Sequence, residues 1–156
     1  CSVRRQRQMC IRDRMETGYV HWGHDISPEE NQFEAGLKFA ISFKKNTNFI
    51  GREVLEKIKD KNTNKKLKMI ILENSKPGEP LLLHDEPIFF KNKIVGRTTS
   101  GNFSFNFNKN LAFGYINSGM SHQQIENSDF EIEVEKKKFK ASILKKPLNS
   151  KKLSEI

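Results

Sequence analysis

The feature that most constrains the fold is a series of short β-rich runs in the second half of the chain. They read KLKMIILEN (66–74), EPIFFKNKIVGRTTSG (86–101), NLAFGYIN (110–117) and FEIEVEKKKFKASIL (130–144). Their β-branched and aromatic residues, separated by turn signals, predict five or six strands. The runs also contain two hairpins, one turning at Lys91-Asn92, where Asn tolerates a positive φ, and one turning around Lys136-Lys137. We therefore expect residues 65–148 to form a small antiparallel β-barrel or a Greek-key sandwich.

The segment before these runs has a mixed pattern. Three local signals are present: a helix start at Ser27-Pro28-Glu29-Glu30, a half-buried strand over 37–43 (LKFAISF), and an amphipathic helix over 49–61. Residues 15–36 are otherwise rich in glycine and proline, which interrupt regular secondary structure. We expect residues 15–62 to be the end of an α+β unit, and residues 149–156 to be a tail.

The net charge of +9 does not by itself indicate a nucleic-acid partner. Residues 1–14 hold five arginines and one aspartate, a net of +4, so the rest of the chain holds 23 basic and 18 acidic groups, a net of +5. The lysines of that part are dispersed among acids or form short runs, which is typical of a solvated face. We expect no nucleic-acid partner. No apolar run is long enough to span a membrane. We therefore expect that the protein does not associate with a membrane, and we expect a cytoplasmic location of the bacterial type.

The residues that could carry chemistry form no catalytic constellation. His21-x-x-His24-Asp25 could begin a metal site, but Gly23 intervenes and no third ligand follows at a recognised spacing, so a hydrogen-bonded loop around Trp22 is favoured. The carboxylates of this region are expected to be caps and solvated charges; they are Asp25, Glu29, Glu30 and Glu34. Residues 96–105 (GRTTSGNFSF) lack phosphate-loop spacing and are expected to be a strand that ends in a turn. We predict no catalytic residue and no metal ligand.

A long string of residues resembles a known family. The segments FEAGLKFAI (33–41), NFIGRE (48–53), GRTTSG (96–101) and LAFGYI (111–116) are similar to the folate-binding part of the glycine-cleavage T-protein (aminomethyltransferase) superfamily. The likeness extends over about residues 15–148. It implies an α+β fold class: the tail of an α+β folate-binding domain, followed by a small antiparallel β-barrel of the aminomethyltransferase C-terminal type.

Two details resemble one branch of that superfamily. The form HWGHDI (21–26), and Phe105 in place of a proline, look like the C-terminal half of dimethylglycine and sarcosine dehydrogenases. In those enzymes a flavin takes a hydride from an N-methyl group and tetrahydrofolate captures the carbon. The resemblance implies tetrahydrofolate as a cofactor, FAD in a missing N-terminal part, and a small methylated amine as substrate. A truncated aminomethyltransferase and a non-catalytic folate-binding scaffold are the alternatives. We expect the fragment alone to be inactive.

The resemblance also implies two folate-binding residues. The aromatic position after E-A-G-L falls on Phe39, whose ring could pack against folate. The alternative is that Phe39 is a core residue of its strand. The arginine that precedes the family's (L/M)-E-x-G-Y falls on Arg14.

Residues 1–14 (CSVRRQRQMCIRDR) differ from the rest, because they hold five arginines and both cysteines. RRQRQMCIRD is encoded by one frame of a common transposon-end sequencing adapter that continues with AG. We therefore interpret residues 1–14 as adapter-derived and disordered. Arg14 lies where the adapter would meet the gene. Its codon would begin with the adapter's AG, and such a codon encodes only Ser or Arg, so the match of Arg14 to the family's arginine can come from the adapter or from the gene.

Overall fold

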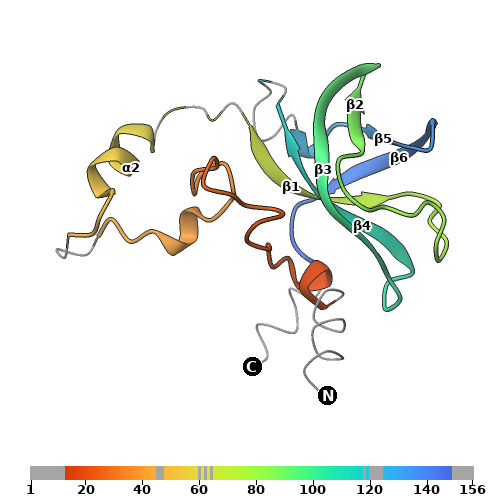
Figure 1. Ribbon diagram of the computed structural model, residues 1–156, viewed down its shortest axis with the longest axis horizontal. Coiled ribbons are helices and arrows are strands. Elements are labelled where there is room, and N and C mark those ends of the chain that lie inside the picture. Colours follow the sequence, from red (N-terminus) through yellow and green to blue (C-terminus); the bar gives the residue numbers. More distant parts are fainter. Residues whose placement is uncertain are drawn as a thin grey trace.

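A computed structural model describes residues 13–44, 48–59, 61, 63, 65–117, 119 and 125–148. Of residues 1–14, for which disorder is predicted, residues 1–12 lie outside the described residues, as does the predicted tail. For Asp13 and Arg14 the prediction of disorder is wrong, because both lie in a helical turn. Six strands form a closed antiparallel barrel in the order β1-β4-β3-β2-β5-β6, and β6 pairs back with β1 (Figure 1). Their bounds are β1 Lys66–Leu72, β2 Pro87–Phe90, β3 Lys93–Ser104, β4 Lys109–Ile116, β5 Phe130–Val134 and β6 Lys137–Leu144. The predicted barrel is confirmed.

Both predicted hairpins are present. Lys91 and Asn92 join β2 to β3 with φ values of 49° and 63°, the pair of positive values that a type I′ turn requires. The second turn consists of Glu135 and Lys136, with φ values of 51° and 63°, one residue earlier than predicted. In both cases the two-residue turn fixes the register of the strands that it joins.

The barrel has an inner and an outer apolar cluster, both of which use β4. The inner cluster fills the barrel and includes Ile70, Ala112 and Ile116. The outer cluster packs Leu111 and Phe113, among others, against Met15, which lies in a helical turn over residues 13–17. Because β4 is buried on both faces, its sequence is a near-continuous apolar run.

The segment before the barrel, residues 27–61, which we call the arm, differs from the sequence prediction. The strand predicted for 37–43 is wrong: Lys38–Ala40 form a short 3-10 helix, η1, in which no residue is buried. Apolar alternation orients side chains, but a strand also needs a neighbour for its backbone hydrogen bonds, and no described strand pairs with this segment. The helix predicted for 49–61 is present but shorter, as α2, Arg52–Ile58, and its apolar face is not buried. It stands apart from the barrel (Figure 1) and buries no residue.

Neither helix of the arm could cross a lipid bilayer, since no helix in the described part of the chain is long and apolar enough to do so.

Candidate functional site

A β-bulge in β3 places two hydroxyl groups on one side of the strand. Thr98 pairs with Gly114 and Ser100 with Phe113, so Thr99 is the extra residue. Successive side chains of a regular strand point to opposite faces. Here both hydroxyls donate to the same carboxylate oxygen, Oδ1 of Asp25, at 2.6 Å from Thr99 and 2.5 Å from Ser100. The bulge therefore makes a double hydrogen-bond donor from neighbouring residues.

The rest of Asp25 is held equally firmly. Its Oδ2 accepts hydrogen bonds from Arg14 Nη1 at 2.5 Å and from the His21 amide at 2.8 Å. We call Asp25 and these four donors the Asp25 clamp. The Asp25 side chain is fully buried. Burial by itself raises the pKa of this carboxyl, but the hydrogen bonds from Ser100, Thr99 and His21, together with the Arg14 charge, lower it below the ordinary 3.8.

These contacts correct one prediction and confirm another. Asp25 is a buried, fully bonded carboxylate and not a solvated charge. Residues 21–26 form a hydrogen-bonded loop, in which the His21 carbonyl accepts from the amides of His24, Asp25 and Ile26. The loop is organised around Asp25, whereas Trp22 is 68% exposed. The rings of His21 and His24 lie 5.0 Å apart, and no group of three potential metal ligands occurs among the described residues.

A second buried carboxylate attaches the same segment farther along β3. Glu16 is 2% exposed, and its Oε1 and Oε2 accept hydrogen bonds from Ser104 Oγ at 2.5 Å and Asn106 Nδ2 at 2.8 Å. We call this set the Glu16 clamp. The two clamps bind residues 13–26 to one strand of the barrel.

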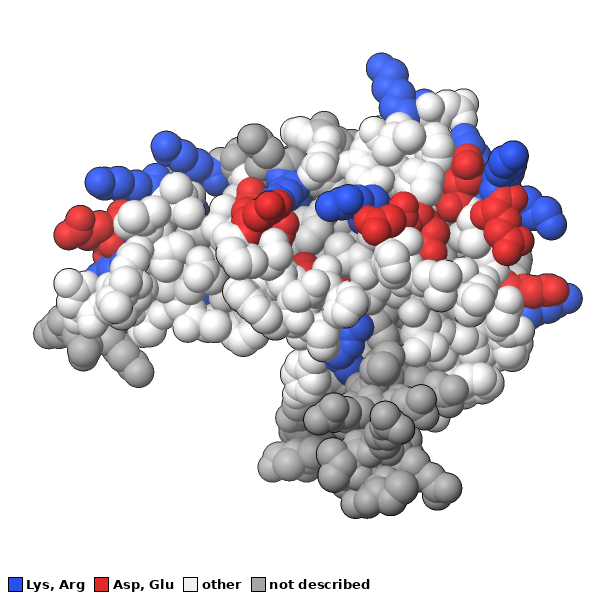
Figure 2. Space-filling view, viewed as in Figure 1, with Lys and Arg blue, Asp and Glu red and all other residues white. Residues whose placement is uncertain are grey.

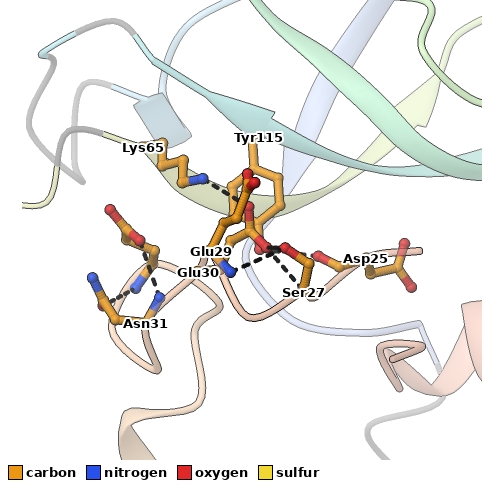
Figure 3. A network of polar contacts seen from close by, with 8 residues as sticks. Asp25, Ser27, Glu29, Glu30, Asn31, Lys65 and Tyr115 are labelled. Atoms are coloured by element: carbon orange, nitrogen blue, oxygen red, sulfur yellow. Dashed lines mark hydrogen bonds and ion pairs between the residues drawn. The ribbon is translucent and has the colours of Figure 1, made fainter. Parts of the chain in front are cut away.

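An ion pair fixes the next turn of the chain (Figure 3). Glu30 Oε1 accepts from Lys65 Nζ at 2.7 Å, while Oε2 accepts from the Ser27 amide at 2.8 Å and the Ser27 hydroxyl at 2.6 Å. Lys65 Nζ also lies 5.2 Å from the centroid of the Tyr115 ring. Burial opposes ionisation of Glu30, but the Lys65 and Ser27 contacts lower its pKa below the ordinary 4.5. The predicted helix start at Ser27 is thus a single turn, in which Glu30 accepts from the Ser27 amide and Ser27 Oγ accepts from the Glu29 amide at 3.2 Å.

A cavity of about 400 Å³ lies between this anchored segment and the barrel. Its walls combine aromatic and aliphatic side chains with three lysines: Tyr19, Val20, Leu37, Phe39, Leu67, Lys68, Met69, Phe113, Leu144, Lys145 and Lys146 among others. We call it the Phe39 cavity. Burial lowers the pKa of Lys68, although the nearby Glu126 carboxylate opposes the shift. Elsewhere acidic and basic side chains are interspersed on the face that Figure 2 shows.

The structure places the two predicted folate residues on either side of this cavity's wall. Phe39 is 85% exposed at the cavity, so it is not a core residue. The Arg14 side chain is 15% exposed, and its Nη1 also donates to the Tyr19 carbonyl at 3.0 Å. Its guanidinium carbon lies 5.7 Å from the centroid of the Phe113 ring, which lines the cavity. Arg14 thus lies behind Phe113, whereas Phe39 lines the cavity itself.

The fold and these anchored residues define a small closed β-barrel domain with the preceding segment, residues 13–26, fixed to its surface. Residues 65–149 match the family described as the glycine cleavage T-protein C-terminal barrel domain, and the chain belongs to this family.

Curated relatives contain the same region within longer proteins. Dimethylglycine dehydrogenase, mitochondrial, from Mus musculus is 31% identical over 137 residues, which cover 86% of this chain and 15% of that protein. An aminomethyltransferase from Symbiobacterium thermophilum is 32% identical over 134 residues, which cover 86% of this chain and 34% of that protein. The chain thus spans about a seventh of the first relative and a third of the second.

A solved structure supports the same fold. The crystal structure of glycine cleavage system aminomethyltransferase T from Bartonella henselae matches with a TM-score of 0.73, at 22% identity, over 86% of this chain and 36% of that chain.

Sequence reasoning missed both clamps. Glu16 was not singled out, and the hydroxyls of Thr99 and Ser100 were interpreted as part of a strand end, although they lie in the middle of β3. A weak signal was present: three consecutive hydroxyl residues, Thr98-Thr99-Ser100, within a predicted strand.

Proposed function

We propose that this chain is part of the folate domain of an enzyme that oxidatively demethylates an N-methylated glycine derivative and transfers the carbon to tetrahydrofolate. Residues 15–62 would be the end of the folate-binding domain and residues 65–148 its barrel domain. The observation that carries this proposal is the Phe39 cavity, with an exposed aromatic ring and three lysines.

The cavity suits the chemistry of folate. A folate has a flat bicyclic ring, a benzoyl ring and a tail of carboxylates. Flat rings pack well against aromatic side chains such as Phe39 and Phe113, while the ammonium groups of Lys145 and Lys146 attract carboxylates. Tetrahydrofolate, when bound, would take up the one-carbon unit. The residues of this chain would orient it and exclude water from one of its faces.

The chain supplies only part of such an enzyme under this proposal. Because it spans about a seventh of a dehydrogenase relative and a third of an aminomethyltransferase relative, we propose that other walls of the folate site, and the FAD that accepts the hydride, belong to a longer parent polypeptide. Redox chemistry rests with the cofactor, so the isolated chain should not oxidise dimethylglycine or sarcosine. A cytoplasmic location belongs to the same proposal.

A titration tests folate binding. A stable reduced folate, 5-formyltetrahydrofolate, is added to the isotope-labelled chain, and amide and aromatic signals are followed by NMR. We expect weak binding, in the millimolar range, with shifts concentrated at Phe39, Tyr19 and Phe113. Phe39→Ala should reduce these shifts. Phe105→Ala is the matched control, because Phe105 is also an exposed phenylalanine, at 58%, but lies outside the cavity. Chemical-shift changes at residues outside the cavity, or changes that are the same size in Phe39→Ala, would contradict the proposal.

A truncated aminomethyltransferase is the second candidate, favoured by the 32% identity to such an enzyme over most of the chain. A non-catalytic folate-binding scaffold is the third. The genomic sequence upstream of the codon for Met15 separates them. A preceding FAD domain with a G-x-G-x-x-G motif supports the dehydrogenase, and its absence from the complete gene supports one of the other two.

A further inference from the structure

We infer that Thr99 and Ser100 are positioning residues for the Arg14 guanidinium, through Asp25. The inference rests on the proposed function and on the folate contact that the family resemblance implies for Arg14. It assigns a role to the barrel: the β-bulge of β3 would set the place of an arginine that belongs to the segment before it.

The first step is the separation of the two Asp25 oxygens. Oδ1 accepts only from the barrel hydroxyls among the contacts described above, at 2.6 Å and 2.5 Å, while Oδ2 faces Arg14 and the His21 amide. The barrel therefore fixes one side of the carboxylate, and the other side is presented to the arginine. A carboxylate held by four donors has little freedom to rotate.

The second step concerns the arginine itself. Both of its polar contacts, to Asp25 Oδ2 and to the Tyr19 carbonyl, use Nη1. Among the described residues, Nε and Nη2 make no such contact. Since a guanidinium is planar and carries five donors in a rigid fork, fixing one corner and stacking the plane near Phe113 fixes the direction of the other corners as well.

The third step is the burial of the pair. The side chains of Arg14 and Asp25 are 15% and 0% exposed, so water cannot readily replace a lost donor to the carboxylate. Without the two hydroxyls, Asp25 would keep only its contacts to Arg14 and His21, and the carboxylate could turn. The arginine would then lose its defined position even though the ion pair could persist.

The Glu16 clamp supplies a matched control on the same strand. Ser104 donates to a buried carboxylate at 2.5 Å, the same distance as Ser100, but its acceptor is Glu16 and not Asp25. Ser104→Ala should therefore destabilise the chain much as Ser100→Ala does, without moving Arg14. A merely structural role of Ser100 would predict the same behaviour for both variants.

The experiment follows the Arg14 side chain by NMR in the full chain. Its Nε–Hε signal is assigned as the one that disappears in Arg14→Lys. We expect Thr99→Val with Ser100→Ala to abolish the separate, slowly exchanging Arg14 signal and to reduce its response to 5-formyltetrahydrofolate about tenfold, in line with the loss of charge-assisted hydrogen bonds. Ser104→Ala should preserve both the signal and the response. Thr99→Ser and Ser100→Thr, which retain the hydroxyls, should behave like the wild type.

Each outcome decides one point. An Arg14 signal that is unchanged in the double variant overturns the positioning role, whatever folate does. An Arg14 signal that is lost equally in Ser104→Ala also overturns it, because the effect is then general loosening. If the wild-type Arg14 signal does not respond to the folate, the contact proposed for Arg14 is contradicted. The positioning role is still decided by the Arg14 signal of the double variant and of Ser104→Ala without folate. Should the double variant fail to fold by circular dichroism, the single variants Thr99→Val and Ser100→Ala carry the same comparison.

Discussion

The hydroxyl of Tyr115 donates a 2.9 Å hydrogen bond to the main-chain carbonyl oxygen of Asp25, 90 residues earlier in the chain. Strand β4 thus holds the backbone of the residue whose side chain is held by β3. Burial, together with the carboxylates of Glu30, Asp25 and Glu34, raises the pKa of Tyr115, so this donor keeps its proton at neutral pH. The loop and the barrel are joined through Asp25 at two independent points, and should unfold together.

Replacement of Asp25 tests that attachment. Asp25→Asn keeps the size of the side chain but removes the charge that Arg14, Thr99 and Ser100 face. Because it leaves a part-buried arginine without its counter-ion, we expect a loss of about 3 kcal/mol in the free energy of unfolding. Urea denaturation, followed by circular dichroism, measures it.

Asp85→Asn is the control for this replacement. Asp85 has a φ of 64°, which Asn tolerates, and its side chain is 60% exposed. Its side chain contacts His84 and Arg97 at the surface, so the change should stay within about 0.5 kcal/mol. Equal losses at the two positions would contradict the assignment of Asp25 as an anchor.

The same carboxylate predicts how stability depends on pH. The folded pKa of Asp25 lies below its ordinary value of 3.8, so the folded state binds this proton less readily than the unfolded state. Its stabilising contribution is therefore fully present well above pH 3.8 and is lost as the pH falls through 3.8 toward the folded pKa. Urea midpoints should fall in that range for the wild type, and fall less for Asp25→Asn. Parallel pH profiles for the two proteins would exclude Asp25 as a source of the acid sensitivity.

The two hairpins of the barrel could be predicted from sequence because their determinants are local. The local patterns alone allowed a barrel or a sandwich, since closure depends on pairing between distant strands such as β1 and β6, and the closed barrel was expected from the family resemblance. The turns at Lys91-Asn92 and Glu135-Lys136 need only neighbouring residues, and the strands between them carry their own apolar patterns. The register of a hairpin then follows from the turn. The local patterns do not determine which residues cover the outer face of β4. That face packs against Met15, which is distant in the sequence.

The Asp25 clamp could not be predicted in the same way. Ser100 and Asp25 are 75 residues apart, and no local pattern in either segment names the other. The bulge at Thr99 breaks the alternation from which strand faces are inferred, so its hydroxyl points to the side that the pattern assigns to its neighbours. The misassigned strand over 37–43 failed for the converse reason: its local pattern was clear, but the described chain offers no strand to pair with it.

Close backbone approach inside the barrel predicts an effect of glycine replacement. A Cβ added at Gly96 would lie 1.8 Å from the main-chain oxygen of Tyr115 on the neighbouring strand. Backbone atoms of a paired strand cannot yield without separating the strands. We expect Gly96→Ala to cost more than about 3 kcal/mol or to prevent folding. Thermal denaturation and soluble yield measure the effect.

Gly119→Ala separates this steric effect from backbone conformation. Gly119 has a φ of 65°, and a Cβ there would meet no atom of the described residues within 4 Å. The only cost is the positive φ, which should be about 1 kcal/mol. If Gly96→Ala destabilised the chain no more than Gly119→Ala, the close approach of β3 to β4 at Gly96 would be contradicted.

The ion pair between Glu30 and Lys65 predicts a measurable coupling between the turn and the start of β1. The Glu30 and Lys65 side chains are 11% and 28% exposed and lie 2.7 Å apart, so solvent screens them less than a surface pair. Glu30→Gln and Lys65→Met should each destabilise the chain, and a double-mutant cycle should give a coupling free energy of about 1 kcal/mol. Urea denaturation of the four proteins in low and high salt provides the cycle. The pair of Lys138 and Glu131, whose side chains are 34% and 41% exposed and lie 3.5 Å apart, is the more exposed control, and its coupling should be about 0.3 kcal/mol and vanish in salt. A Glu30–Lys65 coupling that is as small and as salt-sensitive would mean that the turn is not held to the barrel by this pair.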